Sequence, residues 1–155
     1  MIISPIQEWF RITQKFWLNK EYYSQWGFEW HDWIDIATPI RTNLYSPIDW
    51  VIEIKNQGIK GYWICIVVTE ICGESRRQTL LAHLDDVLVE NWEMVKTGQH
   101  IGYTWNTGNS TWPHLHFSFR RVKSNWEVIN SNNWYKGRED IFWKGWINQY
   151  LPSSY

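Results

Sequence analysis

Two histidines separated by one residue, His114 and His116, stand inside a short apolar run of the 155-residue chain. In an extended strand, alternate side chains point to the same face, so both imidazoles would share a face about 6.6 Å apart. Leu115 and Phe117 would then face the core. Two rings at this spacing can act on one metal ion or on one water molecule. The motif alone is weak, because two histidines on a solvated strand would have the same pattern.

The other histidines strengthen this interpretation, since the chain has five in all. His31 stands four residues before Asp35 in WHDWID, which places both side chains on one face of either a helix or a strand. Catalytic zinc sites commonly combine three imidazole or carboxylate ligands with a position open to water. His31, Asp35 and one histidine of the later pair would form such a set. The other histidine of that pair, and His83 in LLAHL, could lie beside the metal.

Alternation of apolar and polar residues predicts that these side chains lie on a meander of antiparallel strands. The chain has no long segment of 3.6-residue periodicity, so we expect a mainly β fold with little helix. Residues 18–29 are expected to form a loop, and residues 87–89 a short helical turn. The expected strands are 10–16, 45–54, 62–71 and 78–84, followed by a last hairpin at 121–130.

Four segments, taken together, resemble the lysostaphin/LytM-type zinc metallopeptidases, which cut peptide bonds in bacterial peptidoglycan. They follow the family's order, and the resemblance extends from about residue 10 to residue 120. The segments are HDWID (31–35), TPIRTNLYSPIDWVIEI (38–54), LLAHLDDVLV (80–89) and VKTGQHIGYTWNTGNSTWPHLHF (95–117).

The resemblance implies a single antiparallel β-sheet domain with its active site in a groove across the sheet. It implies that His31, Asp35 and His116 bind Zn²⁺, and that His83 and His114 flank the metal-bound water as catalytic histidines. A carboxylate and two neutral imidazoles would leave zinc able to polarise the scissile carbonyl and to lower the pKa of its water towards about 7. One of the two catalytic histidines would take the water's proton and return a proton to the leaving amine.

Two alternatives remain open. The first is a catalytically inactive domain of the same fold that binds peptidoglycan or activates another hydrolase, although such domains usually lack a zinc ligand and this chain has all three. The second is a cupin-like barrel, whose pattern has a glutamate shortly after the histidine pair and a later third histidine. Here the next glutamate is Glu127, and no histidine follows His116.

Length and charge limit the remaining possibilities. A chain of this size predicts one domain, residues 1–155, in which 121–155 form the final hairpin and a C-terminal tail. The net charge of −1 gives no support for a nucleic-acid partner, and no apolar run approaches the ~20 residues of a membrane span. We expect a monomer whose partner is the peptide of peptidoglycan. Which of its bonds is cut stays open.

The N-terminal residues 1–8, MIISPIQE, do not resemble a secretory signal. Because the substrate would lie in the cell wall or periplasm, the sequence is trimmed, the protein is exported by another route, or it is a phage-associated lysin. Cys65 and Cys72 would lie about 23 Å apart on one extended strand. A disulfide needs Cα atoms within about 7 Å, so we predict two free thiols.

Tryptophan is unusually frequent, with 14 residues against 9 glycines. Several tryptophans stand where the family or turn chemistry favours glycine, which adopts positive φ without a clash. An aromatic groove for sugars or peptides is the alternative, but it does not explain this placement. We hypothesise that UGA codons read as glycine were translated as tryptophan, though not at all 14 positions, since 23 glycines would far exceed the roughly 7% of an average chain. The positions are Trp17, Trp30, Trp33, Trp50, Trp63, Trp105, Trp112 and Trp126.

Overall fold

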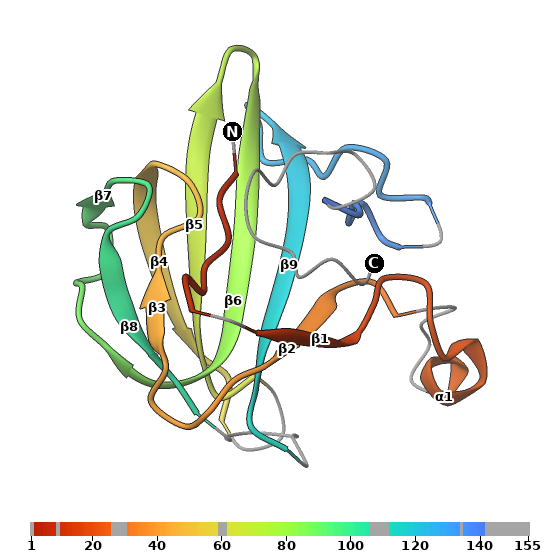
Figure 1. The fold of residues 1–155 in the computed structure, drawn as a ribbon. Helices are drawn as coiled ribbons and strands as arrows, with labels where there is room; N and C mark the ends of the chain where they lie inside the picture. Colours follow the sequence, from red (N-terminus) through yellow and green to blue (C-terminus); the bar gives the residue numbers. More distant parts are fainter. Residues whose placement is uncertain are drawn as a thin grey trace.

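An antiparallel β-sheet dominates the computed structural model, which describes residues 2–8, 10–25, 31–58, 62–105, 112–133 and 135–141 (Figure 1). The strand order is β1-β2-β9-β6-β5-β4-β7, and β8 pairs with both β3 and β6. The one helix of the described residues, α1 (Lys20–Ser24), has five residues. The predicted mainly β fold is therefore confirmed. The strands are β1 (Arg11–Gln14), β2 (Ile34–Ala37), β3 (Asn43–Tyr45), β4 (Trp50–Asn56), β5 (Ile64–Cys72), β6 (Ser75–Val87), β7 (Met94–Val95), β8 (His100–Thr104) and β9 (His114–Lys123).

The longest hairpin joins β5 to β6 and forms the centre of the sheet. Gly73 in its turn has a φ of 61°, a conformation that suits a residue without a Cβ. The predicted free thiols are confirmed, since Cys65 is buried and Cys72 is exposed. Burial raises the pKa of the Cys65 thiol to about 11, so this side chain stays a neutral member of the interior.

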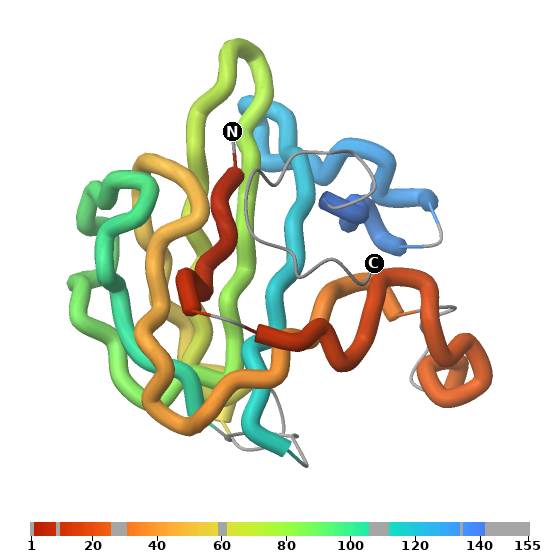
Figure 2. Tube along the Cα trace, in the orientation of Figure 1, coloured from red at the N-terminus to blue at the C-terminus, as the bar shows by residue number. Residues whose placement is uncertain are grey.

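The hydrophobic core lies against one face of the sheet. Leu115, Phe117 and Phe119 of β9 point into it and are almost fully buried. Burial of such a side chain stabilises a fold by about 1.5–3 kcal/mol. Figure 2 shows the N-terminal segment crossing in front of the sheet, and its Ile2 and Ile6 belong to the same core cluster. This segment also hydrogen-bonds to the backbone at positions 45 and 47.

The opposite face of β9 carries the paired histidines, as alternation predicts. The strand lies between β2 and β6, and His116 is paired with Asp35 on one side and with Ala82 on the other. Because directly opposite residues of paired strands share a face, the Asp35 and His116 side chains point to the same side of the sheet. The core therefore fixes the strands whose opposite face carries the candidate site residues.

Two local predictions were wrong and one was confirmed. Residues 18–29 were expected to form a loop, but they contain α1. Val87 does not begin a helical turn, because it ends β6 and pairs with Gly102 of β8. The hairpin at 121–130 is present, with a bridge between Val122 and Val128. Among the described residues, no helix has the length and apolar character needed to cross a membrane.

Candidate metal centre

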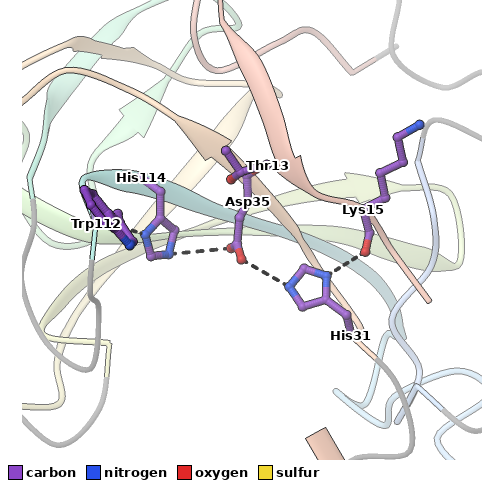
Figure 3. Close-up of polar contacts among 6 residues, drawn as sticks. All are labelled: Thr13, Lys15, His31, Asp35, Trp112 and His114. Carbon is purple, nitrogen blue, oxygen red and sulfur yellow. Dashed lines mark hydrogen bonds and ion pairs between the residues drawn. The ribbon is translucent and has the colours of Figure 1, made fainter. Parts of the chain in front are cut away.

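His31 is held by a backbone hydrogen bond that fixes which ring nitrogen faces the site. Its Nδ1 lies 2.8 Å from the carbonyl oxygen of Lys15 (Figure 3). A carbonyl oxygen can only accept, so Nδ1 carries the proton, and in the neutral ring Nε2 keeps its lone pair. This Nε2 lies 3.2 Å from Oδ2 of Asp35. A backbone carbonyl behind a histidine is the usual arrangement for a metal ligand.

His114 is held in the same way on the other side of Asp35. Its Nδ1 donates to the carbonyl oxygen of Trp112 at 2.8 Å, and its Nε2 lies 3.6 Å from Oδ1 of Asp35. Figure 3 shows both imidazoles pointing at one carboxylate. In their neutral forms, the two rings direct lone pairs at a group that can itself only accept hydrogen bonds when ionised. Such an arrangement requires a cation, either a proton on a ring or a metal ion.

The spacing of His31 and Asp35 suits a zinc ion. Zinc lies about 2.0–2.2 Å from nitrogen and oxygen ligands in tetrahedral sites, which places two ligand atoms roughly 3.3–3.6 Å apart. The 3.2 Å between Nε2 of His31 and Oδ2 of Asp35 is close to this value. Oδ1 of Asp35 is buried and has no hydrogen-bond partner among the described residues. The spacing of this pair therefore fits two ligands of the predicted metal.

His116 is a buried imidazole with an unsatisfied nitrogen. The side chain is 1% exposed, and its Nε2 has no hydrogen-bond partner in the described part of the chain. Burial lowers the pKa of His116 well below the ordinary value, and the neighbouring His83 lowers it further. The ring is therefore neutral, which is the form that binds a metal. The Tyr62 ring packs against it with 4.6 Å between centroids.

His83 is aimed at the site by a β-bulge. The pairing of β6 with β5 shifts register between Ala82 and Leu84, so His83 is the extra residue of the bulge. Its φ is 64°, a conformation that is unusual for a residue with a Cβ. Its ring lies 4.7 Å from the His114 ring. Bulges often redirect a side chain next to an active site. Here the bulge and the positive φ together place the His83 ring beside His114.

Trp33 lies against both imidazoles of the predicted ligand set, those of His31 and His116. Its ring centroid is 4.5 Å from that of His31 and 4.6 Å from that of His116, on which it stacks. With this indole in place, the described residues contain no group of three donors that could hold a metal ion. His31 and Asp35 are brought together, whereas the third predicted ligand, His116, is not joined to them. The assignment of the ligand set stays a prediction.

Sequence reasoning missed two features next to the site: the ion pair of Asp32 with Arg138, and the ring of Tyr62. Asp32 is 0% exposed and forms an ion pair with Arg138, which lies beyond the resemblance. Tyr62 contacts both His83 and His116, and burial raises the pKa of its hydroxyl, which therefore remains a hydrogen-bond donor. An isolated arginine in a tail and a tyrosine at a strand entry have no distinctive spacing, so no sequence signal marked either one.

Comparison with known proteins assigns the chain to a family. Residues 29–131 match the profile described as Peptidase family M23. The chain belongs to peptidase family M23. The match covers the loop before β2, all strands from β2 to β9, and every predicted site residue. The resemblance to lysostaphin-type peptidases is thus confirmed, and the chain is a peptidase domain by family.

Individual relatives agree with this assignment. The M23 chain is 36% identical over 88 residues to peptidoglycan DD-endopeptidase ShyB of Vibrio cholerae, which covers 56% of this chain and 20% of the relative. It superposes on a zinc containing peptidase from Vibrio cholerae with a TM-score of 0.61 and 27% identity, covering 83% of this chain and 38% of the other. For the catalytic domain of lysostaphin from Staphylococcus simulans, the TM-score is 0.56 and the identity 28%, with 74% and 77% covered. The chain spans about a fifth of the length of the Vibrio endopeptidase.

Proposed function

We propose that this M23 domain is a zinc-dependent endopeptidase that hydrolyses peptide bonds in bacterial peptidoglycan cross-links or stem peptides. The observation that carries the proposal is the convergence of His31 and His114 on Asp35, with each imidazole held from behind by a backbone carbonyl. The names of the curated relatives, which include peptidoglycan DD-endopeptidases, support this substrate class. The domain would act as a monomer outside the cytoplasm, in the cell wall or periplasm, or as a phage-associated lysin.

The residues divide into two roles. His31, Asp35 and His116 would hold zinc, which when bound supplies a Lewis acid for the scissile carbonyl and its attacking water. His83 and His114 lie side by side next to this set. The Nδ1 of His114 is engaged by the Trp112 carbonyl, so its Nε2 is the nitrogen able to accept a proton. One of these two histidines removes the proton of the attacking water and the same proton is passed to the leaving amine.

Substitution of His116 by alanine is expected to abolish stoichiometric zinc binding. The substitution removes one of three protein ligands, and the remaining pair cannot complete the site. Metal analysis of the purified protein would measure zinc per chain, with His100→Ala as the matched control, because His100 lies in β8 against Tyr45 and Tyr103. Full zinc occupancy in His116→Ala would refute the ligand assignment.

A binding domain of the same fold is the second candidate, and one observation favours it. In the chain as written, the Trp33 indole lies against His31 and His116, and no three donors among the described residues converge. Incubation with purified peptidoglycan distinguishes the two. The endopeptidase releases soluble fragments, and mass spectrometry of those fragments identifies the bond. Retention on peptidoglycan without any release would identify the binding domain.

A further inference from the structure

Tryptophan occupies glycine-like backbone conformations in the described part of the chain. Five of the eight described tryptophans have positive φ, as do four of the five described glycines. Among all other described residues, only five share this feature, namely Asn19, Arg41, His83, Asn130 and Lys136. A bulky residue at positive φ is an outlier, because its Cβ clashes with the backbone. The tryptophans are Trp17 (72°), Trp50 (107°), Trp63 (56°), Trp92 (73°) and Trp126 (70°).

The turn at Trp92 shows why the backbone requires this conformation. The Glu93 N–H donates to the Glu90 carbonyl at 3.1 Å, which closes a four-residue turn with Trp92 in the third position. A type II turn needs a positive φ of about 80° at that position, which is why glycine is usual there. The Trp92 N–H also donates to the Ile52 carbonyl at 2.8 Å. The conformation is therefore fixed by two hydrogen bonds, and the side chain has no part in it.

The hairpin loop at Trp126 repeats the argument with a different turn. Three residues connect Lys123 to Glu127, and the Trp126 N–H donates to the Lys123 carbonyl at 3.0 Å. Three-residue hairpin loops are typically a type I turn followed by one left-handed residue, and that residue favours glycine. Trp126 stands at this left-handed position. The backbone conformation at both turns is therefore the one expected of glycine, although the residue is tryptophan.

The indoles contribute little that could offset the strain. Trp92 and Trp126 are 63% and 57% exposed, and Trp17 and Trp50 are also exposed. Their contacts lie on the surface, such as the Arg76 guanidinium over the Trp126 ring and the hydrogen bond from Trp17 Nε1 to Asp140. Trp17 also lies edge-on to the rings of Phe16 and Tyr135, and Trp63 is half-buried. An apolar side chain that stays largely exposed adds little burial free energy to the fold. Selection for the indole does not explain this set.

We infer that the functional protein carries glycine at positions 17, 50, 63, 92 and 126, encoded by UGA codons that its source reads as glycine. The backbone evidence is independent of family comparison, and it adds Trp92, which the sequence pattern did not indicate. Trp33 joins the set through a different observation, its contact with both His31 and His116. The assignment of position 33 rests on the proposed zinc site, whereas the other five do not.

Paired substitutions separate backbone strain from loss of the indole. Each Trp→Gly change at the five positions should raise Tm by about 2–4 °C, because it removes the Cβ clash. Each matching Trp→Ala change removes the indole but keeps the Cβ, and should give no such rise. Trp112→Gly is the control: the sequence pattern included position 112, but Trp112 is 77% exposed and is not among the residues with positive φ, so no rise in Tm is expected there. Equal Tm values for the glycine and alanine variants would overturn the inference.

The gene and the native protein provide a test that does not depend on folding. We expect UGA at the five codons and glycine in peptides of the protein isolated from its own source, measured by mass spectrometry. UGG codons at these positions, or tryptophan in those peptides, would refute the recoding. This test remains possible even if the protein with tryptophan at these positions is too strained to purify.

For position 33, zinc titration into the metal-free protein is the measurement, and it needs no turnover. Trp33→Gly should increase zinc affinity about 10- to 100-fold, the range typical of changes next to metal ligands. Equal affinity in the two proteins would remove position 33 from the set. Failure of both proteins to bind zinc would contradict the proposed metal site, while the Tm comparison at the other five positions would be unaffected.

Discussion

Alanine at His83 or at His114 is expected to lower the turnover of purified peptidoglycan by about a hundred- to ten-thousand-fold, the usual worth of a proton-transfer group. The two ring centroids lie 4.7 Å apart, His114 lies beside Asp35, and neither histidine belongs to the proposed ligand set. Zinc content should therefore stay at the parent level while the rate falls. Measurement of soluble fragment release and of metal content on the same preparations separates the two effects.

His100→Ala is the matched control for both variants. His100 is a partly buried histidine, and its ring nitrogen donates to the Gly102 carbonyl at 3.0 Å. It packs against Tyr45 and Tyr103 rather than against the site. Its replacement should leave the turnover unchanged. A parent-level rate in His83→Ala or His114→Ala would show that the corresponding ring has no catalytic role.

Much of the site could be predicted because strands impose a simple rule on side chains. The alternation of His114 and His116 with Leu115 and Phe117 placed both imidazoles on one face, and the register of β9 with β2 places Asp35 opposite His116. The long central strands were predictable from composition as well, because the β-branched residues of β5 fit a buried, pleated surface. Periodicity carries this information wherever one face of a strand is buried.

The position of His83 could not be derived from that rule. Simple alternation puts residue 83 on the same face as Leu81, which is fully buried in the core. The bulge reverses the faces after Ala82, so that Leu84 enters the core and His83 turns towards His114. The cause is that β6 pairs with β5 and with β8 in registers that shift along its length, whereas its pairing with β9 keeps one register and ends at Ala82. Such a register conflict arises only when all these strands are assembled.

The role of the tail was equally invisible in the sequence. Residues 132–155 lie beyond the family match, yet the described part of this tail returns to β9, where the Glu139 N–H donates to the Phe119 carbonyl at 3.0 Å. This return brings Arg138 to Asp32, the residue that follows the predicted ligand His31. A single arginine in a segment without periodicity predicts nothing about its partner, because the contact spans 106 residues.

Replacement of Arg138 by methionine is expected to cost about 3–5 kcal/mol of folding stability, the usual loss when one partner of a buried ion pair is removed. Asp32 is fully buried, and its other carboxylate oxygen has no hydrogen-bond partner among the described residues. Burial raises the pKa of Asp32, and the Arg138 guanidinium opposes that rise. Without Arg138, folding must either bury an uncompensated carboxylate beside His31 or protonate it, and both cost free energy, so zinc affinity should fall together with stability.

Urea unfolding of four proteins tests this expectation: the parent, Arg138→Met, Lys123→Met, and the double variant Asp32→Asn with Arg138→Met. The Lys123–Glu127 pair is the control, because both side chains are more than half exposed and such pairs contribute at most about 1 kcal/mol. The double variant should recover part of the loss, since asparagine removes the buried charge while keeping its shape. Equal losses in Arg138→Met and Lys123→Met would mean that the tail only covers the sheet. A loss confined to Arg138→Met, with recovery in the double variant, would mean that the tail holds the segment of the predicted ligand His31 through charge.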